Sequence, residues 1–136
     1  MRAAVTRFGP IAVGGALGTL LRYWLELQLG SAVGFPLGVF VANVTGAFII
    51  GVTLTLLPIA SSRSGPLLRL FLATGFCGGL TTLSTLAVAI ATALMKLGIG
   101  AALWYAGATI AAGVVAAIAG RGAGRVWYRI RRSPAC

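Results

Sequence analysis

Residues 75–86 read Gly-Phe-Cys-Gly-Gly-Leu-Thr-Thr-Leu-Ser-Thr-Leu and lie in the middle of a long apolar run. Adjacent Gly78 and Gly79, followed by four hydroxyl residues, lower helix propensity where a membrane helix most needs its internal hydrogen bonds. The stretch therefore predicts a helix broken at mid-membrane. Freed carbonyls at that depth suit a cation and are expected to meet an ion or a partner chain. The alternative is a continuous helix whose hydroxyls bond to the preceding turn.

The composition around this stretch is that of a membrane protein. The chain has 136 residues, of which 59% are hydrophobic and 9% are charged, and its mean hydropathy is +1.01. An ordinary soluble domain carries roughly 25% charged residues. Solvation by a lipid bilayer explains the difference, and we predict an all-α integral membrane protein.

Four apolar stretches are long enough to cross a membrane. About 20 helical residues span a hydrocarbon core of about 30 Å. Turn-forming residues, rich in Gly, Ser and Pro, separate the stretches. The sequence thus predicts a single four-helix transmembrane domain over residues 1–136, in which the third span is the broken one. The predicted spans are residues 8–27, 35–57, 67–94 and 97–120.

Pairs of glycines four positions apart recur in these spans. In lipid, small residues let helix backbones approach one another closely. We interpret these pairs as packing positions rather than as functional ones. The pairs are Gly14 with Gly18, Gly75 with Gly79, and Gly120 with Gly124.

The basic residues are distributed asymmetrically along a chain of net charge +10. Because Lys and Arg are retained on the cytoplasmic side of short loops, both termini are expected in the cytoplasm if the chain inserts in one orientation. The membrane would be the plasma (inner) membrane, crossed several times. Only Arg22 and Lys96 fall towards the opposite side. The residues expected on the cytoplasmic side are Arg2, Arg7, Arg63, Arg69, Arg121, Arg125, Arg129, Arg131 and Arg132.

The segment after residue 120 places arginines beside Val126, Trp127, Tyr128 and Ile130. This mixture predicts a basic tail at the membrane interface. Basic charge flanking apolar spans favours contact with anionic lipid headgroups, whereas a nucleic-acid binder would carry its charge on a soluble domain. We therefore expect membrane lipid, and no nucleic acid, as a partner.

The inventory of reactive side chains argues against an enzyme. The chain has no histidine, its one acidic residue is Glu26, and its two cysteines, Cys77 and Cys136, lie in unlike surroundings. Metal-dependent, carboxylate-pair and Cys/His catalysis lack the residues that they need. A disulfide framework is equally unsupported. We expect no catalytic residues.

Two spans carry polar groups that need partners. Asn43 lies among apolar neighbours, where an unpaired amide would cost several kcal/mol. It either holds two helices together or donates a hydrogen bond to a dehydrated anion. Tyr105 and Thr109 are four positions apart and share one helix face, which Gly113 continues. This face lines a pore, or Tyr105 beside Trp104 is an interfacial aromatic anchor.

Arg22 lies near the end of the first span and is followed one turn later by Glu26. Its guanidinium group can extend to the interface or pair with that carboxylate. The functional alternative is a positively charged vestibule that concentrates anions at the mouth of a pore.

Taken together, these residues resemble the Fluc family of fluoride channels, also called CrcB proteins. Members are small four-helix membrane proteins that assemble as antiparallel dimers. The similarity covers most of the chain, and its most specific part is residues 75–85. Further matching positions are Gly14, Gly18, Arg22 and Tyr23 in the first span and Gly38, Asn43, Gly46 and Gly51 in the second.

The resemblance implies sites for two ions. The backbone carbonyls of Gly78 and Thr81 would hold a structural sodium ion at the centre of the dimer, and no organic cofactor is implied. Arg22 would belong to a vestibule. The residues implied along the fluoride pathway are Asn43, Leu83, Ser84, Thr85, Leu86, Tyr105 and Thr109.

The chain departs from the family pattern at several positions. The family usually has phenylalanine where this chain has Leu83 and Leu86, and the electropositive edges of those rings face fluoride. It often has an acidic residue at the position of Ala89 and a hydroxyl at that of Gly113. Some members work as two different subunits of fixed, opposite orientation rather than as one dual-topology chain. Two arrangements stay open, a homodimer and a heterodimer whose partner supplies the phenylalanines.

The function implied by the resemblance is passive export of fluoride from the cytoplasm, and hence fluoride resistance. One alternative is a proton-coupled exporter of the small-multidrug type, which also has four spans. Such transport needs a titratable group deep in the membrane, and Glu26 lies close to a helix end. A further alternative is an accessory subunit that does not conduct by itself.

Overall fold

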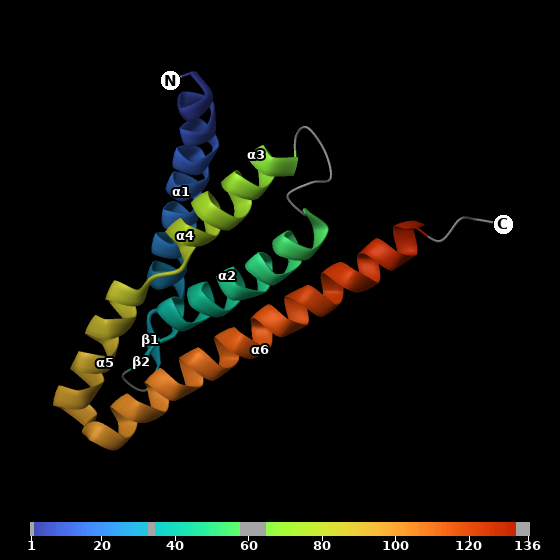
Figure 1. Cartoon of the computed structure of the whole chain (residues 1–136). Coiled ribbons are helices and arrows are strands. Elements are labelled where there is room, and N and C mark those ends of the chain that lie inside the picture. The colour runs from blue at the N-terminus through green and yellow to red at the C-terminus, as the bar shows by residue number, and fades with distance from the viewer. Residues whose placement is uncertain (1, 33–34, 58–64, 133–136) are drawn as a thin grey trace.

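The computed structural model describes residues 2–32, 35–57 and 65–132, and most of these residues are helical (Figure 1). The only strands among them are two residues long and form one antiparallel pair, in which Ala32 lies opposite Phe35. The elements in chain order are α1 (Arg2–Leu29), β1 (Ser31–Ala32), β2 (Phe35–Pro36), α2 (Leu37–Leu56), α3 (Gly65–Arg69), the π-helix η1 (Leu70–Phe76), α4 (Cys77–Leu80), α5 (Leu83–Leu97) and α6 (Ile99–Arg132).

Three helical runs in the described part of the chain have the length and hydropathy of membrane spans: Leu37–Leu56, Gly65–Leu97 and Ile99–Ile130. They match the second, third and fourth predicted spans, so an all-α, multi-pass membrane protein is confirmed. Helix α1 is long enough, with 28 residues, but Arg22 and Glu26 reduce its hydropathy and it is not among the three. The first span therefore stays a prediction.

Helix α1 packs against η1 and α4 through glycines on both sides. A Cβ atom at Gly14 would collide with the Phe71 carbonyl, and one at Gly18 with the Phe76 carbonyl. In the other direction, a Cβ at Gly79 would collide with the backbone of Gly15. The helices are thus in backbone contact, which confirms the packing role of these glycines.

Helices α2 and α6 form the second close pair, and they lie side by side along the whole of α2 (Figure 1). Gly51 of α2 faces the backbone of Ala117, and Gly120 of α6 faces the Phe48 carbonyl. Gly124 packs on the Thr55 side chain. The register between α2 and α6 is therefore fixed by positions at which only glycine leaves room.

The segment η1 is a π-helix, in which the Cys77 amide donates to the Leu72 carbonyl five residues earlier. One such turn within a longer helix inserts an extra residue and shifts the faces on either side of it. Here the shift falls where η1 contacts α1 through Gly75. The sequence analysis did not predict this turn.

The helical run Gly65–Leu97 is interrupted between α4 and α5 by two extended residues (Figure 1). Thr81 has φ −82° and ψ 146°, and Thr82 has φ −145° and ψ 123°. The interruption lies within the predicted stretch but after the two glycines, since Gly78 and Gly79 are still helical. Thr82 caps the restarted helix, because its side chain accepts a 3.2 Å hydrogen bond from the Thr85 amide.

The connection between α5 and α6 is the single residue Gly98, whose φ of 90° suits glycine. It agrees with the two-residue gap between the predicted spans 67–94 and 97–120. Helix α6 then continues for 34 residues, about 50 Å at 1.5 Å per residue. It includes Arg121, Arg125 and Arg129, so the basic tail is a helical extension of the last span.

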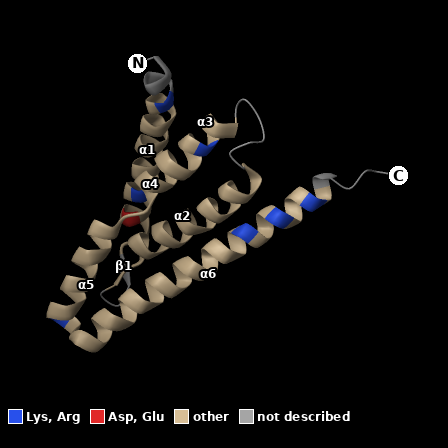
Figure 2. Ribbon diagram, in the orientation of Figure 1, with Lys and Arg blue, Asp and Glu red and all other residues tan. Residues whose placement is uncertain are grey.

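Most of the described basic residues lie towards one end of the molecule, while one lies beside the acidic residue of α1 and one at the α5–α6 turn (Figure 2). The end that also holds both termini carries the basic residues of the first turns of α1, of α3 and of the second half of α6. The α5–α6 turn lies at the opposite end. This arrangement matches the charge asymmetry of the sequence.

Candidate functional site

Asn43 of α2 is bonded twice to the main chain of Thr82. Its Oδ1 accepts a 2.8 Å hydrogen bond from the Thr82 amide, and its Nδ2 donates a 3.3 Å bond to the Thr82 carbonyl. Asn43 thereby gives the Thr82 amide a partner in place of the one that the interruption removes. Of the two interpretations of Asn43, the structure shows the one in which it joins two helices. The second Nδ2 hydrogen is not used in either bond.

The hydroxyl groups around the interruption bond mainly to one another. Thr82 Oγ1 donates to Thr85 Oγ1 at 3.1 Å and also lies 3.1 Å from Ser84 Oγ. Thr81 Oγ1 instead donates to the Cys77 carbonyl at 2.9 Å. The alternative in which the hydroxyls bond back to the preceding turn therefore applies to Thr81, but α4 and α5 do not form a continuous helix.

A pocket of about 240 Å³ adjoins this interruption. One wall is polar and is made by Asn43, Thr81 and Thr82, and the rest is made by Leu83 and Leu86. Leu83 is 80% exposed and Leu86 only 6%. The structure thus brings Asn43 together with both leucines that stand where the family usually has phenylalanine.

Tyr105 and Thr109 lie on the inner face of α6. Tyr105 Oη donates a 3.0 Å hydrogen bond to the Pro36 carbonyl, and its ring stacks on Phe35 with centroids 5.1 Å apart. Thr109 Oγ1 donates to the Tyr105 carbonyl at 2.8 Å. Because Tyr105 is only 2% exposed, its interpretation as an interfacial anchor is wrong. The exposed ring at that place belongs to Trp104.

The Tyr105–Thr109 face and the Asn43 pocket are separate but adjacent. Neither Tyr105 nor Thr109 lines that pocket. Leu86 connects the two regions, because it also belongs to a buried cluster with Val39 and Tyr105. Of the predicted pathway residues, the structure therefore places Asn43, Leu83 and Leu86 around one pocket and the α6 hydroxyls behind it.

Arg22 binds both a carboxylate and the interrupted helix. Its Nη1 lies 3.0 Å from Glu26 Oε1, and the predicted ion pair is confirmed. Its Nε donates to the Gly79 carbonyl at 3.4 Å, and Thr19 Oγ1 donates to the same oxygen at 3.5 Å. In a continuous helix this carbonyl would accept from the Leu83 amide. Arg22 and Thr19 replace that lost partner.

The carbonyl oxygens of Gly78 and Thr81 are the ones expected to hold a cation. In a continuous helix the Thr82 amide would donate a hydrogen bond to the Gly78 carbonyl. Here it donates to Asn43 Oδ1 instead. Thr81 is itself extended, so its carbonyl leaves the helical direction. The described residues contain no cluster of His, Cys, Asp and Glu that could hold a metal ion. Neutral carbonyl oxygens fit a hard monovalent cation, but two of them do not complete its shell.

Three functional positions were missed by the sequence analysis: Thr82, Thr19 and Phe35. Thr82 carries a local signal, because a threonine three residues before a hydroxyl at the start of an apolar helix is a typical N-cap. Thr19 and Phe35 carry none. Their partners, Gly79 and Tyr105, are distant in the sequence and are set by helix packing.

These features define a class, that of helical multi-pass membrane proteins with polar groups collected at an interrupted span. The sequence profile of the family described as "CrcB-like protein, Camphor Resistance (CrcB)" matches residues 10–121. The chain belongs to this family.

Similar proteins align over most of their length and each is named "Fluoride-specific ion channel FluC". The protein from Acidobacterium capsulatum is 42% identical over 110 residues, which are 78% of this chain and 86% of the relative. That from Methanopyrus kandleri is 38% identical over 126 residues, 93% of this chain and 95% of the relative. That from Thermus thermophilus is 41% identical over 120 residues, 85% and 91% respectively.

Proposed function

We propose that this chain is a pore-forming subunit of a channel through which fluoride leaves the cytoplasm passively. Membership of the CrcB-like family and the names of three relatives support the choice of ion. The observation that carries the proposal for this chain is the interruption at Thr82, which Asn43 holds open beside a pocket. The proposed function is not that of an enzyme.

The proposed topology has four spans, with α1 as the first. Residues 81 and 82 lie at the middle of the 33-residue run Gly65–Leu97, which supports an interruption at mid-membrane. Both termini would be cytoplasmic in the plasma (inner) membrane, because the basic residues lie towards their end of the molecule.

Fluoride would exchange much of its water for donors along this chain. The N–H of Asn43 that is not bonded to Thr82 is the first donor that it meets in the pocket, and the hydroxyls of Ser84 and Thr85 lie beside that of Thr82. The hydroxyls of Tyr105 and Thr109 follow, and the bonds that they now donate to backbone carbonyls must open to serve the ion. Several weak contacts in series let an ion leave as readily as it enters.

Arg22 would contribute a positive potential at one mouth of the pathway. Its side chain is 23% exposed, pairs with Glu26 and donates a hydrogen bond to the Gly79 carbonyl. An ion approaching through water would be attracted by that potential. Arg22 would thus combine a vestibule role with support of the interrupted helix.

The channel would be an antiparallel dimer. The pocket is open on the side where Leu83 is 80% exposed, so a second subunit is needed to close it. The partner is a second copy or a homologous chain of the opposite orientation. The charge asymmetry opposes insertion in both orientations, and a homologous partner would supply rings in place of Leu83 and Leu86; the homodimer and the heterodimer both stay open.

A structural sodium ion is proposed between the two subunits. Gly78 and Thr81 of one chain would supply two carbonyl oxygens, and the equivalent pair of the partner would double that set. Such an ion would neutralise carbonyl dipoles that the interruption leaves in the low-dielectric interior. The bond between Asn43 and the Thr82 amide, which leaves the Gly78 carbonyl without its helical donor, supports this proposal.

The direct test is fluoride efflux from liposomes that contain the purified chain, recorded with a fluoride electrode. Efflux from the chain alone supports a homodimer, and efflux only with a co-encoded homologue supports a heterodimer. If neither preparation conducts while a known family member does in the same assay, the proposed function is wrong.

The proton-coupled exporter receives no support from the structure. The chain has a single acidic residue, and that residue, Glu26, is 30% exposed and paired with Arg22. A coupling carboxylate needs to load and release protons deep in the membrane. Transport in this chain therefore does not depend on proton coupling through an acidic side chain.

A further inference from the structure

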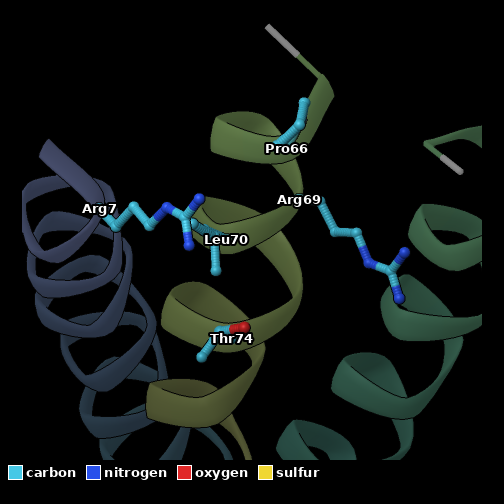
Figure 3. Close-up of a pocket in the computed structure, with 5 residues that line it drawn as sticks. All are labelled: Arg7, Pro66, Arg69, Leu70 and Thr74. Carbon is cyan, nitrogen blue, oxygen red and sulfur yellow. The ribbon is translucent and has the colours of Figure 1, made fainter. Parts of the chain in front are cut away.

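A second pocket lies away from the interruption, between α1 and the start of the third helical run. Its volume is about 350 Å³, and it is lined by Arg7, Pro66, Arg69, Leu70 and Thr74. Figure 3 shows Arg7 reaching from α1 across to Leu70, while Arg69 extends from the other side of the same helix. The Arg69 guanidinium group points away from Arg7, and Thr74 lies one turn below Leu70.

No carboxylate side chain of this protein can neutralise these arginines. The sequence contains one acidic residue, Glu26, and its Oε1 is bonded to Arg22 at 3.0 Å. Any negative charge between Arg7 and Arg69 must therefore come from another molecule. Guanidinium groups match phosphate oxygens in geometry as well as in charge.

The fold builds this pocket from segments that are far apart in the sequence. Arg7 belongs to α1, and Arg69 is the last residue of α3. Contact of Gly14 with Phe71 and Gly75 holds α1 against η1 one to two turns below the pocket. The spacing of the two arginines is thus set by a rigid helix contact rather than by loops.

The remaining walls suit a lipid better than a small anion. Pro66 and Leu70 are apolar, and the neighbouring Leu67 and Leu68 are 42% and 46% exposed. The pocket also lies at the end of the molecule where basic residues gather (Figure 2). Anionic lipid headgroups are attracted to such clusters at the ends of spans.

We propose that Arg7 and Thr74 bind the phosphate group of an anionic phospholipid, whose acyl chains lie along Leu67 and Leu70, while Arg69 adds positive charge from the other side of the helix. This site is distinct from the interruption, and the proposal does not depend on fluoride conduction. The lipid would bridge α1 and α3 at the end of their contact.

Native mass spectrometry of the purified protein tests this inference. The probes are phosphatidylglycerol and phosphatidylcholine with identical acyl chains, added separately. The wild type is expected to bind phosphatidylglycerol about tenfold more tightly, and Arg7→Gln/Arg69→Gln is expected to lose most of that preference. The matched control, Arg125→Gln/Arg129→Gln, removes two exposed charges of the basic tail, which attracts anionic headgroups in general, and should lower the preference by no more than about threefold.

Two outcomes would overturn the proposal. An equal loss in both double variants would mean that general basic charge attracts the lipid. Displacement of bound phosphatidylglycerol by millimolar inorganic phosphate would mean that the pocket takes a free anion rather than a lipid. Should the double variant fail to fold, Arg7→Gln alone is used, since Arg7 is exposed; it should lower the preference about threefold, and no change would also overturn the proposal.

Discussion

The side chain of Asn43 and the main chain of Thr82, 39 positions apart in the sequence, are joined by hydrogen bonds of 2.8 and 3.3 Å. This pair links α2 to the point where the third helical run stops and restarts. It makes the interruption a defined structure rather than a frayed helix end. The following predictions start from this pair and move outward.

Replacing Asn43 should separate support of the backbone from interaction with the ion. Asn43→Leu removes both bonds to Thr82 and leaves its amide without that partner, at a cost of about 1–3 kcal/mol. We expect a lower thermal unfolding midpoint in detergent and no fluoride efflux. Thr92→Val, which removes an α5 hydroxyl bonded within its own helix, should leave both readouts almost unchanged.

Asn43→Asp is the sharper variant of this position. The carboxylate can still accept from the Thr82 amide, but it has no N–H to offer an anion and adds negative charge beside the pocket. We expect stability closer to the wild type than that of Asn43→Leu, with efflux reduced at least tenfold, as for loss of about 1.4 kcal/mol of ion stabilisation. Normal efflux from Asn43→Asp would remove Asn43 from the proposed pathway.

The Arg22–Glu26 ion pair should contribute less to stability and to fluoride efflux than the hydrogen bond from Arg22 to the Gly79 carbonyl. Both side chains of the ion pair are partly exposed, and such pairs contribute about 0–1 kcal/mol. Glu26→Gln is therefore expected to keep efflux within about twofold of the wild type. Arg22→Gln should be more destabilising, because it weakens the support of the Gly79 carbonyl. Loss of transport in Glu26→Gln alone would favour proton coupling.

Glycines of α6 provide a matched test of the packing. A Cβ at Gly120 would collide with the Phe48 carbonyl, whereas nothing lies within 4 Å of one at Gly122. Gly120→Ala should therefore destabilise the protein by about 1–3 kcal/mol. Gly122→Ala should be neutral or stabilising by up to about 1 kcal/mol through helix propensity. Unfolding midpoints of the two variants, measured in one detergent, check this contrast.

The two leucines of the pocket should respond differently to an aromatic ring. Leu83 is 80% exposed, so Leu83→Phe has room and should raise efflux from the chain when it is reconstituted alone. Leu86 is 6% exposed, and Leu86→Phe should overpack the core at a cost of about 1–3 kcal/mol. If Leu83→Phe folds but leaves efflux unchanged, the missing ring at that position does not limit conduction.

Much of the fold followed from properties that each segment carries by itself. Span lengths depend on runs of apolar residues. The second and third spans were predicted within a few residues of the observed helices, whereas the fourth helix runs ten residues beyond its predicted end, from Gly120 to Ile130. The first predicted span contains Arg22 and Glu26, so hydropathy alone does not establish it. The position of the interruption was predicted only to the stretch 75–86, because glycines and hydroxyls both disfavour a helix. The observed position of the interruption is set by Thr82, which caps the helix that restarts after it.

The sequence by itself determined the membrane environment, the approximate length of the apolar helices, the charge asymmetry and the absence of catalytic groups, since these depend only on which residues are present and in what order. Only the tertiary structure decided that Asn43 binds Thr82, that Tyr105 turns inward to Pro36 and that Arg22 reaches Gly79. These pairs depend on the register between helices. That register is set by glycine contacts at which neighbouring backbones touch, and a single helix carries no record of it.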